Sequence, residues 1–153
     1  MTKARPQDVL GGSWIIDSGP GQFKMIVSYI PCGEGKLAAV AFPGIDFGWT
    51  LGGLKPTAAH ATTFHGVVEV DEQGIGFSLV GYILDNCSKP VYILKAVGRK
   101  IVVDQDTLRV ENLVFQFYND PETANPVTDK VDFCVPADGT FPPIREYRIQ
   151  LKR

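Results

Sequence analysis

The stretch Gly12-Ser13-Trp14-Ile15-Ile16-Asp17 decides the fold of this chain, and it follows a short polar lead of residues 1–11. Glycine lets a backbone enter a strand at a tight bend, where a Cβ atom would clash. Tryptophan is large enough to plug one end of a barrel with its ring, while its indole N–H finds a partner near the rim. We therefore expect Gly12 to lead the backbone into the first strand of a small closed β-barrel, with Trp14 at one end.

Beyond Asp17 the chain consists of short, partly alternating segments separated by turn-forming sequences. Asp71-Glu72-Gln73-Gly74 is one strong break, and the two-residue connection Gly98-Arg99 is expected to close a type II′ hairpin. The expected strands span residues 13–17, 22–30, 36–42, 62–70, 75–84, 91–97, 100–103, 108–118, 127–135 and 144–152. No segment has a convincing helical period, so the sequence predicts an antiparallel all-β sandwich or barrel.

Length and composition limit the classes of protein to which this chain can belong. A chain of 153 residues fits one domain, and apolar and charged fractions of 44% and 21% argue against disordered, fibrous and membrane proteins. The formal charge of −2 comes with scattered basic residues, which disfavours nucleic-acid binding. The N-terminal charges precede no apolar segment, and no apolar run approaches the ~20 residues of a membrane span. A cytoplasmic location is expected, with the removal of a leader peptide left open.

The cysteines and histidines predict neither a disulfide framework nor a metal site. The chain has an odd number of cysteines and no C-x-x-C pair, and the three are Cys32, Cys87 and Cys134. We therefore expect them to be reduced and buried or half-buried. Neither His60 nor His65 has a recognised ligand spacing from them. No metal or cofactor is therefore expected.

The chain resembles the lipocalins and their calycin relatives in the Gly12-Ser13-Trp14 motif, in its antiparallel meander and in an arginine on its last strand. The resemblance implies one up-and-down barrel over residues 1–153, with 1–11 as an N-terminal arm, about eight to ten strands and little helix. It also implies that the late arginine packs across the Trp14 ring at the closed end.

Arg145 is assigned as that arginine because it has the parity of Tyr147, Ile149 and Leu151, and Arg148 is the alternative if the register differs by one residue. Gly12, Trp14 and Arg145 would then close the barrel. An acidic T-D-Y type motif, a secretory leader and the usual disulfide are not evident. These departures indicate an outlying calycin-like protein of bacterial type.

An eight-stranded barrel is either filled by side chains or wide enough for one small ligand. The inferred inward faces and the apolar loop at 45–53 supply candidate ligand-binding residues, which are Phe23, Met25, Tyr29, Trp49, Phe77, Phe115, Phe117 and Tyr147. Such a lining favours a small apolar or aromatic molecule held by shape and stacking. The expected partner is a small hydrophobic molecule, with a homodimer left open.

Catalytic chemistry has few candidates. They are His60, His65 and Glu69, and His65 shares the parity of Glu69 rather than that of Phe64, which predicts that it faces solvent. One alternative function is a lipocalin-like enzyme, an isomerase, lyase or chromophore-handling protein that uses a His, Tyr or Glu of the cavity. A second alternative is a structural or assembly protein with a filled barrel.

Overall fold

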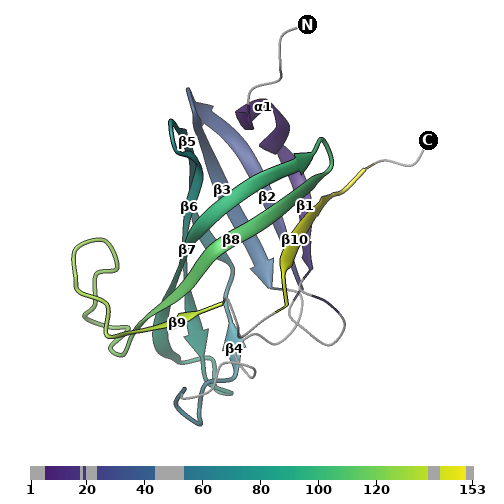
Figure 1. Cartoon of the computed structure of the whole chain (residues 1–153). Coiled ribbons are helices and arrows are strands. Elements are labelled where there is room, and N and C mark those ends of the chain that lie inside the picture. Colours follow the sequence, from purple (N-terminus) through teal and green to yellow (C-terminus); the bar gives the residue numbers. More distant parts are fainter. Residues whose placement is uncertain (1–5, 18, 20–23, 44–53, 138–141, 151–153) are drawn as a thin grey trace, which may run out of the picture.

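The computed structural model describes residues 6–17, 19, 24–43, 54–137 and 142–150. Within these ranges the chain forms one short helix and ten strands (Figure 1). The elements are α1 (Pro6–Leu10), β1 (Gly12–Asp17), β2 (Lys24–Gly33), β3 (Lys36–Pro43), β4 (His60–Ala61), β5 (Phe64–Asp71), β6 (Gly74–Leu84), β7 (Pro90–Asp104), β8 (Thr107–Tyr118), β9 (Phe133–Pro136) and β10 (Ile144–Arg148). Helix α1 has five residues, far too few to cross a bilayer, and no other helix is found in the described ranges.

Eight of the strands close into an antiparallel barrel. The order around the sheet is β10-β1-β2-β3-β5-β6-β7-β8, and β8 pairs with β10 to complete the ring. The two remaining strands are additions, since β4 pairs with β6, and β9 pairs with the part of β8 that lies beyond β10. This confirms the predicted all-β, up-and-down barrel with little helix.

One end of the barrel is closed by α1 and Trp14. Helix α1 lies beside the start of β1, at the end where tight turns join β2 to β3, β5 to β6 and β7 to β8 (Figure 1). Trp14 and Leu10 are fully buried, and the indole Nε1 of Trp14 donates a hydrogen bond to the Leu10 carbonyl oxygen at 2.9 Å. Gly12 has a φ of 112°, which a residue with a Cβ rarely adopts. Strand β1 begins at Gly12, one residue before the predicted start at Ser13.

The predicted hairpin at Gly98-Arg99 is wrong, because β7 runs unbroken through both residues. Gly98 instead permits a close approach between strands. A Cβ atom at this position would lie 2.9 Å from the Phe77 ring and 3.1 Å from the Cα of Leu113. The glycine therefore makes room for the Phe77 side chain without turning the chain.

The predicted parity of the last strand is also wrong. In β10 the buried residues are Ile144 and Glu146, whereas Arg145 and Tyr147 are exposed. Residues directly opposite in an antiparallel pair share a face of the sheet, and Trp14 is opposite Arg148. The Arg148 guanidinium accordingly lies 4.3 Å from the centre of the Trp14 ring, and Arg145 does not cover it.

The error in parity has an identifiable source. The expected last strand included Ile149 and Leu151, and their parity was used to place Arg145. Strand β10 ends at Arg148, however, and Ile149 is 46% exposed. Leu151 lies outside the described residues. Apolar residues that do not belong to β10 therefore suggested the wrong parity, and the alternative register with Arg148 is the correct one.

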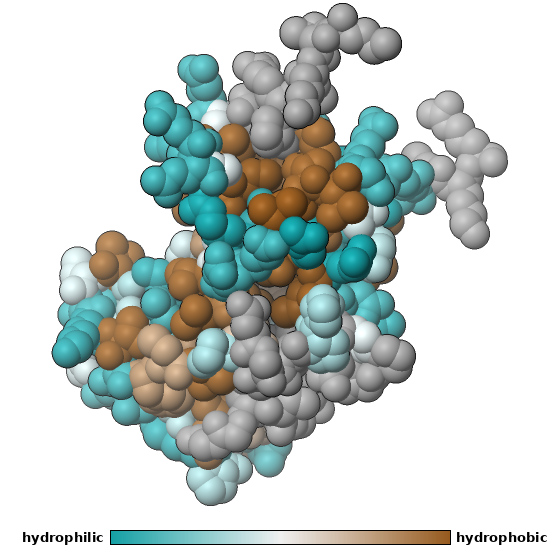
Figure 2. Space-filling model, in the orientation of Figure 1, coloured by the Kyte–Doolittle hydropathy of each residue, from teal (hydrophilic) through white to brown (hydrophobic). Residues whose placement is uncertain are grey.

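Apolar residues also occupy part of the outer surface. Figure 2 shows apolar side chains gathered in the upper part of the face on which β7 and β8 lie in front in Figure 1. A separate row of outward-facing apolar residues crosses β10, β1, β2 and β3, because Tyr147 is opposite Ile15, Ile15 is opposite Ile26, and Ile26 is opposite Phe42. These four side chains are between 39% and 59% exposed. We call them the outer apolar row.

Candidate functional site

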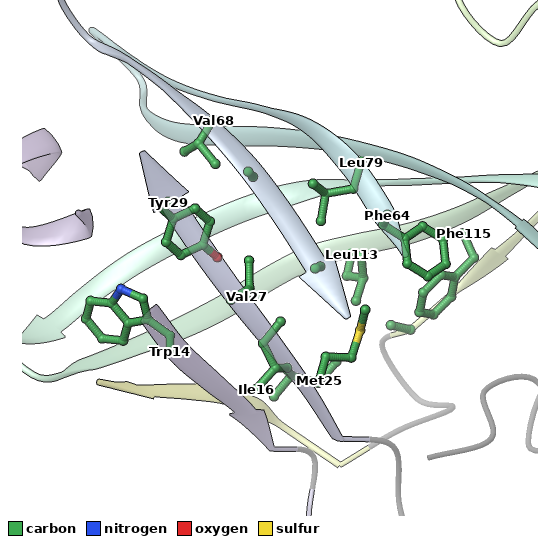
Figure 3. Close-up of a cluster of buried hydrophobic side chains, with 14 of the residues drawn as sticks. Trp14, Ile16, Met25, Val27, Tyr29, Phe64, Val68, Leu79, Leu113 and Phe115 are labelled. Carbon is green, nitrogen blue, oxygen red and sulfur yellow. The ribbon is translucent and has the colours of Figure 1, made fainter. Parts of the chain in front are cut away.

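The barrel encloses a small cavity of about 40 Å³. Twelve of the described residues line it, and Lys100 is the one among them with a charged side chain. Met25, Phe64 and Phe115 belong to this lining and lie toward the opposite end of the barrel from Trp14 (Figure 3). The cavity is therefore separate from the Trp14–Arg148 contact at the closed end.

The cavity is partly open and small. Phe77, Ala96 and Val110 line it and remain half-buried, whereas most inward-facing residues of the barrel are buried. One water needs about 10–15 Å³ of such space, so about three waters would fill the cavity. Pockets for drug-sized ligands measure about 300–1,000 Å³. A ligand of ring size would therefore displace side chains of the lining, among which Met25 is unbranched and adaptable.

A group of three polar side chains lies inside the barrel next to this cavity. Tyr29 of β2, Lys100 of β7 and Glu146 of β10 are each at most 3% exposed. The Tyr29 hydroxyl donates a hydrogen bond to Glu146 Oε1 at 2.5 Å, and Lys100 Nζ donates to Glu146 Oε2. We call these residues the interior polar cluster.

Aromatic rings complete the surroundings of the lysine. Lys100 Nζ lies 4.4 Å from the centre of the Phe77 ring and 5.1 Å from that of the Tyr29 ring, distances at which a cation is attracted to a ring face. Because Lys100 and Glu146 carry opposite charges, the pair is neutral overall. A lone buried charge would be far less favourable than this hydrogen-bonded pair.

Burial raises the pKa of the Tyr29 hydroxyl well above its ordinary value of 10.0, and the neighbouring Glu146 adds to this effect through its charge and its hydrogen bond. The tyrosinate form is disfavoured because a buried anion would face the carboxylate. Tyr29 therefore remains a neutral hydrogen-bond donor at physiological pH.

Arg148 joins the closed end to three parts of the chain. Its guanidinium donates hydrogen bonds to the carbonyl oxygens of Val9, Gly11 and Gln105, and its Nε donates to Asp106 Oδ1 at 3.1 Å. Together with its contact on the Trp14 ring, these bonds tie α1 and the β7–β8 turn to the end of β10. This arrangement closes this end of the barrel, and the Arg148 guanidinium lies there rather than in the lining of the cavity.

Three of the predicted ligand-binding residues line the cavity, namely Met25, Phe77 and Phe115. Tyr29 also faces the interior but belongs to the polar cluster. Phe117 is buried away from the cavity lining, and its ring stacks on that of Phe133 with centroids 4.7 Å apart.

The remaining predicted ligand-binding residues do not enter the site. Tyr147 is 45% exposed on the outer face of β10, so its predicted place in the cavity is wrong for the same reason as that of Arg145. Phe23 and Trp49 lie outside the described residues.

The three catalytic candidates lie away from the cavity. His65 and Glu69 are exposed on β5, which confirms that His65 faces solvent, and His60 is exposed on β4. The expectation of buried or half-buried cysteines is wrong, because Cys32, Cys87 and Cys134 are all exposed free thiols. Their strands or turns place these side chains away from the interior.

Lys100 and Glu146 were not among the residues predicted for the site. The signal for Glu146 was its position two residues before Arg148, since residues i and i+2 share a face of a strand. Lys100 stands directly before the apolar run Ile101-Val102-Val103 and shares the parity of Val102, which is half-buried. Two opposite charges at inward positions of distant strands indicate a buried pair.

Comparisons with protein-family models, with curated proteins and with solved structures find no match to this chain. The fold and the site therefore define the class of protein by themselves. It is a closed eight-stranded antiparallel β-barrel with a small, mainly apolar cavity and a buried, neutral Lys–Glu pair beside it.

Proposed function

We propose that this protein binds one small, largely apolar molecule in the barrel cavity. The observation that carries the proposal is the lining, in which eleven apolar residues among those described accompany Lys100 around a partly open space. Apolar surface that faces water in a partly open cavity is unfavourable, and a small hydrophobic guest would cover it. Because even a ring-sized ligand would displace side chains of the lining, the guest in this proposal is no larger than a single ring or a short chain.

In this proposal the protein is a lipocalin-like member of the calycins, whose closed barrel end it resembles. Gly12 and Trp14 begin the first strand, α1 covers the same end, and an arginine of the last strand stacks on the tryptophan. In this proposal the closed end is structural and the ligand occupies the half of the barrel that Met25 and Phe115 line.

The proposal is tested by filling the cavity. Ala96 lines it, so Ala96→Leu would occupy the space that the guest needs. Ala38 lies half-buried on the other face of a strand, between the buried Leu37 and Ala39, and Ala38→Leu is the matched control. With ethylbenzene as the probe in ligand-observed NMR, we expect Ala96→Leu to weaken binding at least about tenfold, in line with the loss of a buried site. Equal binding by both variants would place the probe elsewhere.

Assembly of the chain with a second copy is the other candidate function, and the outer apolar row favours it. Tyr147, Ile15, Ile26 and Phe42 are paired across four strands and exposed, so a second copy could cover them through the same surface. Native mass spectrometry of the purified protein distinguishes the two functions. A co-purified small molecule supports binding, and a bare dimer that Phe42→Ser converts to a monomer supports assembly.

A further inference from the structure

We propose that the molecule held in the cavity is uncharged and carries a carbonyl oxygen, which accepts a hydrogen bond from Lys100 Nζ. This inference rests on the proposed function and specifies its ligand class. Lys100 is the residue that connects the two parts of the site, because it lines the cavity and also pairs with Glu146.

Lys100 has more hydrogen-bond donors than Glu146 uses. A lysine ammonium group has three N–H donors and no acceptor. Among the described residues, Lys100 Nζ donates to Glu146 Oε2, and its other close partners are the faces of the Tyr29 and Phe77 rings. Ring faces satisfy an N–H group less well than an oxygen does, so Lys100 retains donor capacity beside the cavity.

The Lys100–Glu146 pair also determines which charge a ligand can carry. Glu146 already neutralises Lys100 in an interior where both are at most 3% exposed. A ligand carboxylate would add a second negative charge against a single lysine, and a ligand ammonium would add a second positive one. Either ligand would be disfavoured by the repulsion and by its own desolvation. The neutral pair therefore selects a neutral ligand.

The kind of acceptor on the ligand follows from the rest of the lining. The eleven other described residues of the lining have apolar side chains, so this part of the cavity offers little to a ligand O–H or N–H donor. Neither Glu146 nor Tyr29 belongs to the described lining, so their oxygens do not face the ligand. A ligand hydroxyl would therefore bury a donor without an acceptor among the described lining side chains, whereas a ketone only accepts. The combination of an apolar body and a carbonyl oxygen fits all three conditions.

The test uses three probes of similar shape: acetophenone, ethylbenzene and benzoate. They are titrated against the wild-type protein and against Tyr29→Phe/Lys100→Met/Glu146→Leu, which replaces the whole interior polar cluster by apolar side chains of similar volume. Such complete replacements of buried ion pairs are often neutral or stabilising, whereas a single substitution would leave a buried charge unpaired. The measured quantity is the ratio of the ethylbenzene to the acetophenone dissociation constant.

We expect that ratio to fall about tenfold or more in the triple variant, because a hydrogen bond from a charged donor is lost only by the ketone. An unchanged ratio, or benzoate binding as tightly as acetophenone, would overturn the inference while leaving the proposed function in place. If none of the three probes binds to the wild-type protein, the proposed function fails and the inference fails with it.

A second measurement needs no variant. The C=O stretching frequency of isotope-labelled acetophenone, measured by difference infrared spectroscopy on the wild-type complex, should lie below its value in a hydrocarbon solvent, because a hydrogen bond weakens the carbonyl bond. A frequency equal to that in hydrocarbon would show a carbonyl without a donor and would overturn the inference.

Discussion

The interior polar cluster shows how a few residues set the character of this barrel. Tyr29 and Lys100 both donate to Glu146, so every polar atom in the group has a partner. Buried polar groups without partners are destabilising, and satisfied ones specify how the surrounding strands must align. At this scale a single hydroxyl or ammonium group has consequences for stability and for ligand choice.

Tyr29→Phe should lower the free energy of unfolding by about 1–3 kcal/mol at neutral pH, because Glu146 loses a hydrogen-bond donor in the interior. The raised pKa of Tyr29 gives this difference a pH dependence. Above about pH 10 the unfolded chain releases the tyrosine proton while the folded chain retains it, so the wild-type protein loses stability as pH rises. Phenylalanine has no such proton.

We therefore expect the wild-type advantage to shrink as pH rises above about 10. Urea unfolding of both proteins at a series of pH values measures it, and all other titrating groups are common to the two. A stability difference that stays constant across this alkaline range would contradict the assigned pKa direction.

Arg148 and Arg145 provide a matched pair on β10. Arg148→Ala removes the contact with the Trp14 ring and the hydrogen bonds to Val9 and Gly11, and should cost about 2 kcal/mol or more. Arg145→Ala removes an exposed side chain and should change stability by no more than about 0.5 kcal/mol. Denaturant unfolding measures both. Equal losses would mean that the closed end does not depend on Arg148.

At the scale of elements, the approach of neighbouring strands depends on glycines at particular places. Gly66 of β5 is one, since an added Cβ atom would lie 1.8 Å from the backbone oxygen of Ser78 in β6. Gly76 of β6 is different, because its nearest neighbour would be the flexible Arg99 side chain at 3.6 Å. The sheet therefore has no room for a side chain at Gly66 and has room at Gly76.

We predict that Gly66→Ala destabilises the protein by about 2 kcal/mol or more, because two strands must move apart. Gly76→Ala should change stability by no more than about 0.5 kcal/mol. Thermal unfolding followed by circular dichroism compares the two variants. A mild effect at Gly66 would show that β5 and β6 shift at little energetic cost.

At the scale of the whole molecule, cavity binding should appear as stability. A ligand that binds only the folded state raises the free energy of unfolding by about 2.7 kcal/mol at a concentration of 100 times its dissociation constant. Acetophenone should therefore raise the unfolding temperature of the wild-type protein in a concentration-dependent manner. Ala38→Leu should show the same increase and Ala96→Leu should not. A similar shift in Ala96→Leu would point to binding outside the cavity.

Much of the barrel could be predicted from local patterns. Alternation and turn residues located most strands, and Gly12-Ser13-Trp14 marked where the first strand begins. Met25, Phe77 and Phe115 were placed in the interior for the same reason, since residues two apart in a strand share a face. The prediction was wrong where contacts with a neighbouring strand decide the role of a residue. Gly98 is an example, because its role depends on Phe77 and Leu113.

The amino-acid sequence by itself determined the all-β class, the position of most strands and the tryptophan that closes one end, because these follow from properties of residues near one another in the chain. Only the tertiary structure decided that Arg148 covers Trp14 and that Lys100 meets Glu146 beside the cavity. These contacts join residues separated by whole strands, and a shift of one residue in the register of β10 would turn Glu146 outward and bring Arg145 inside.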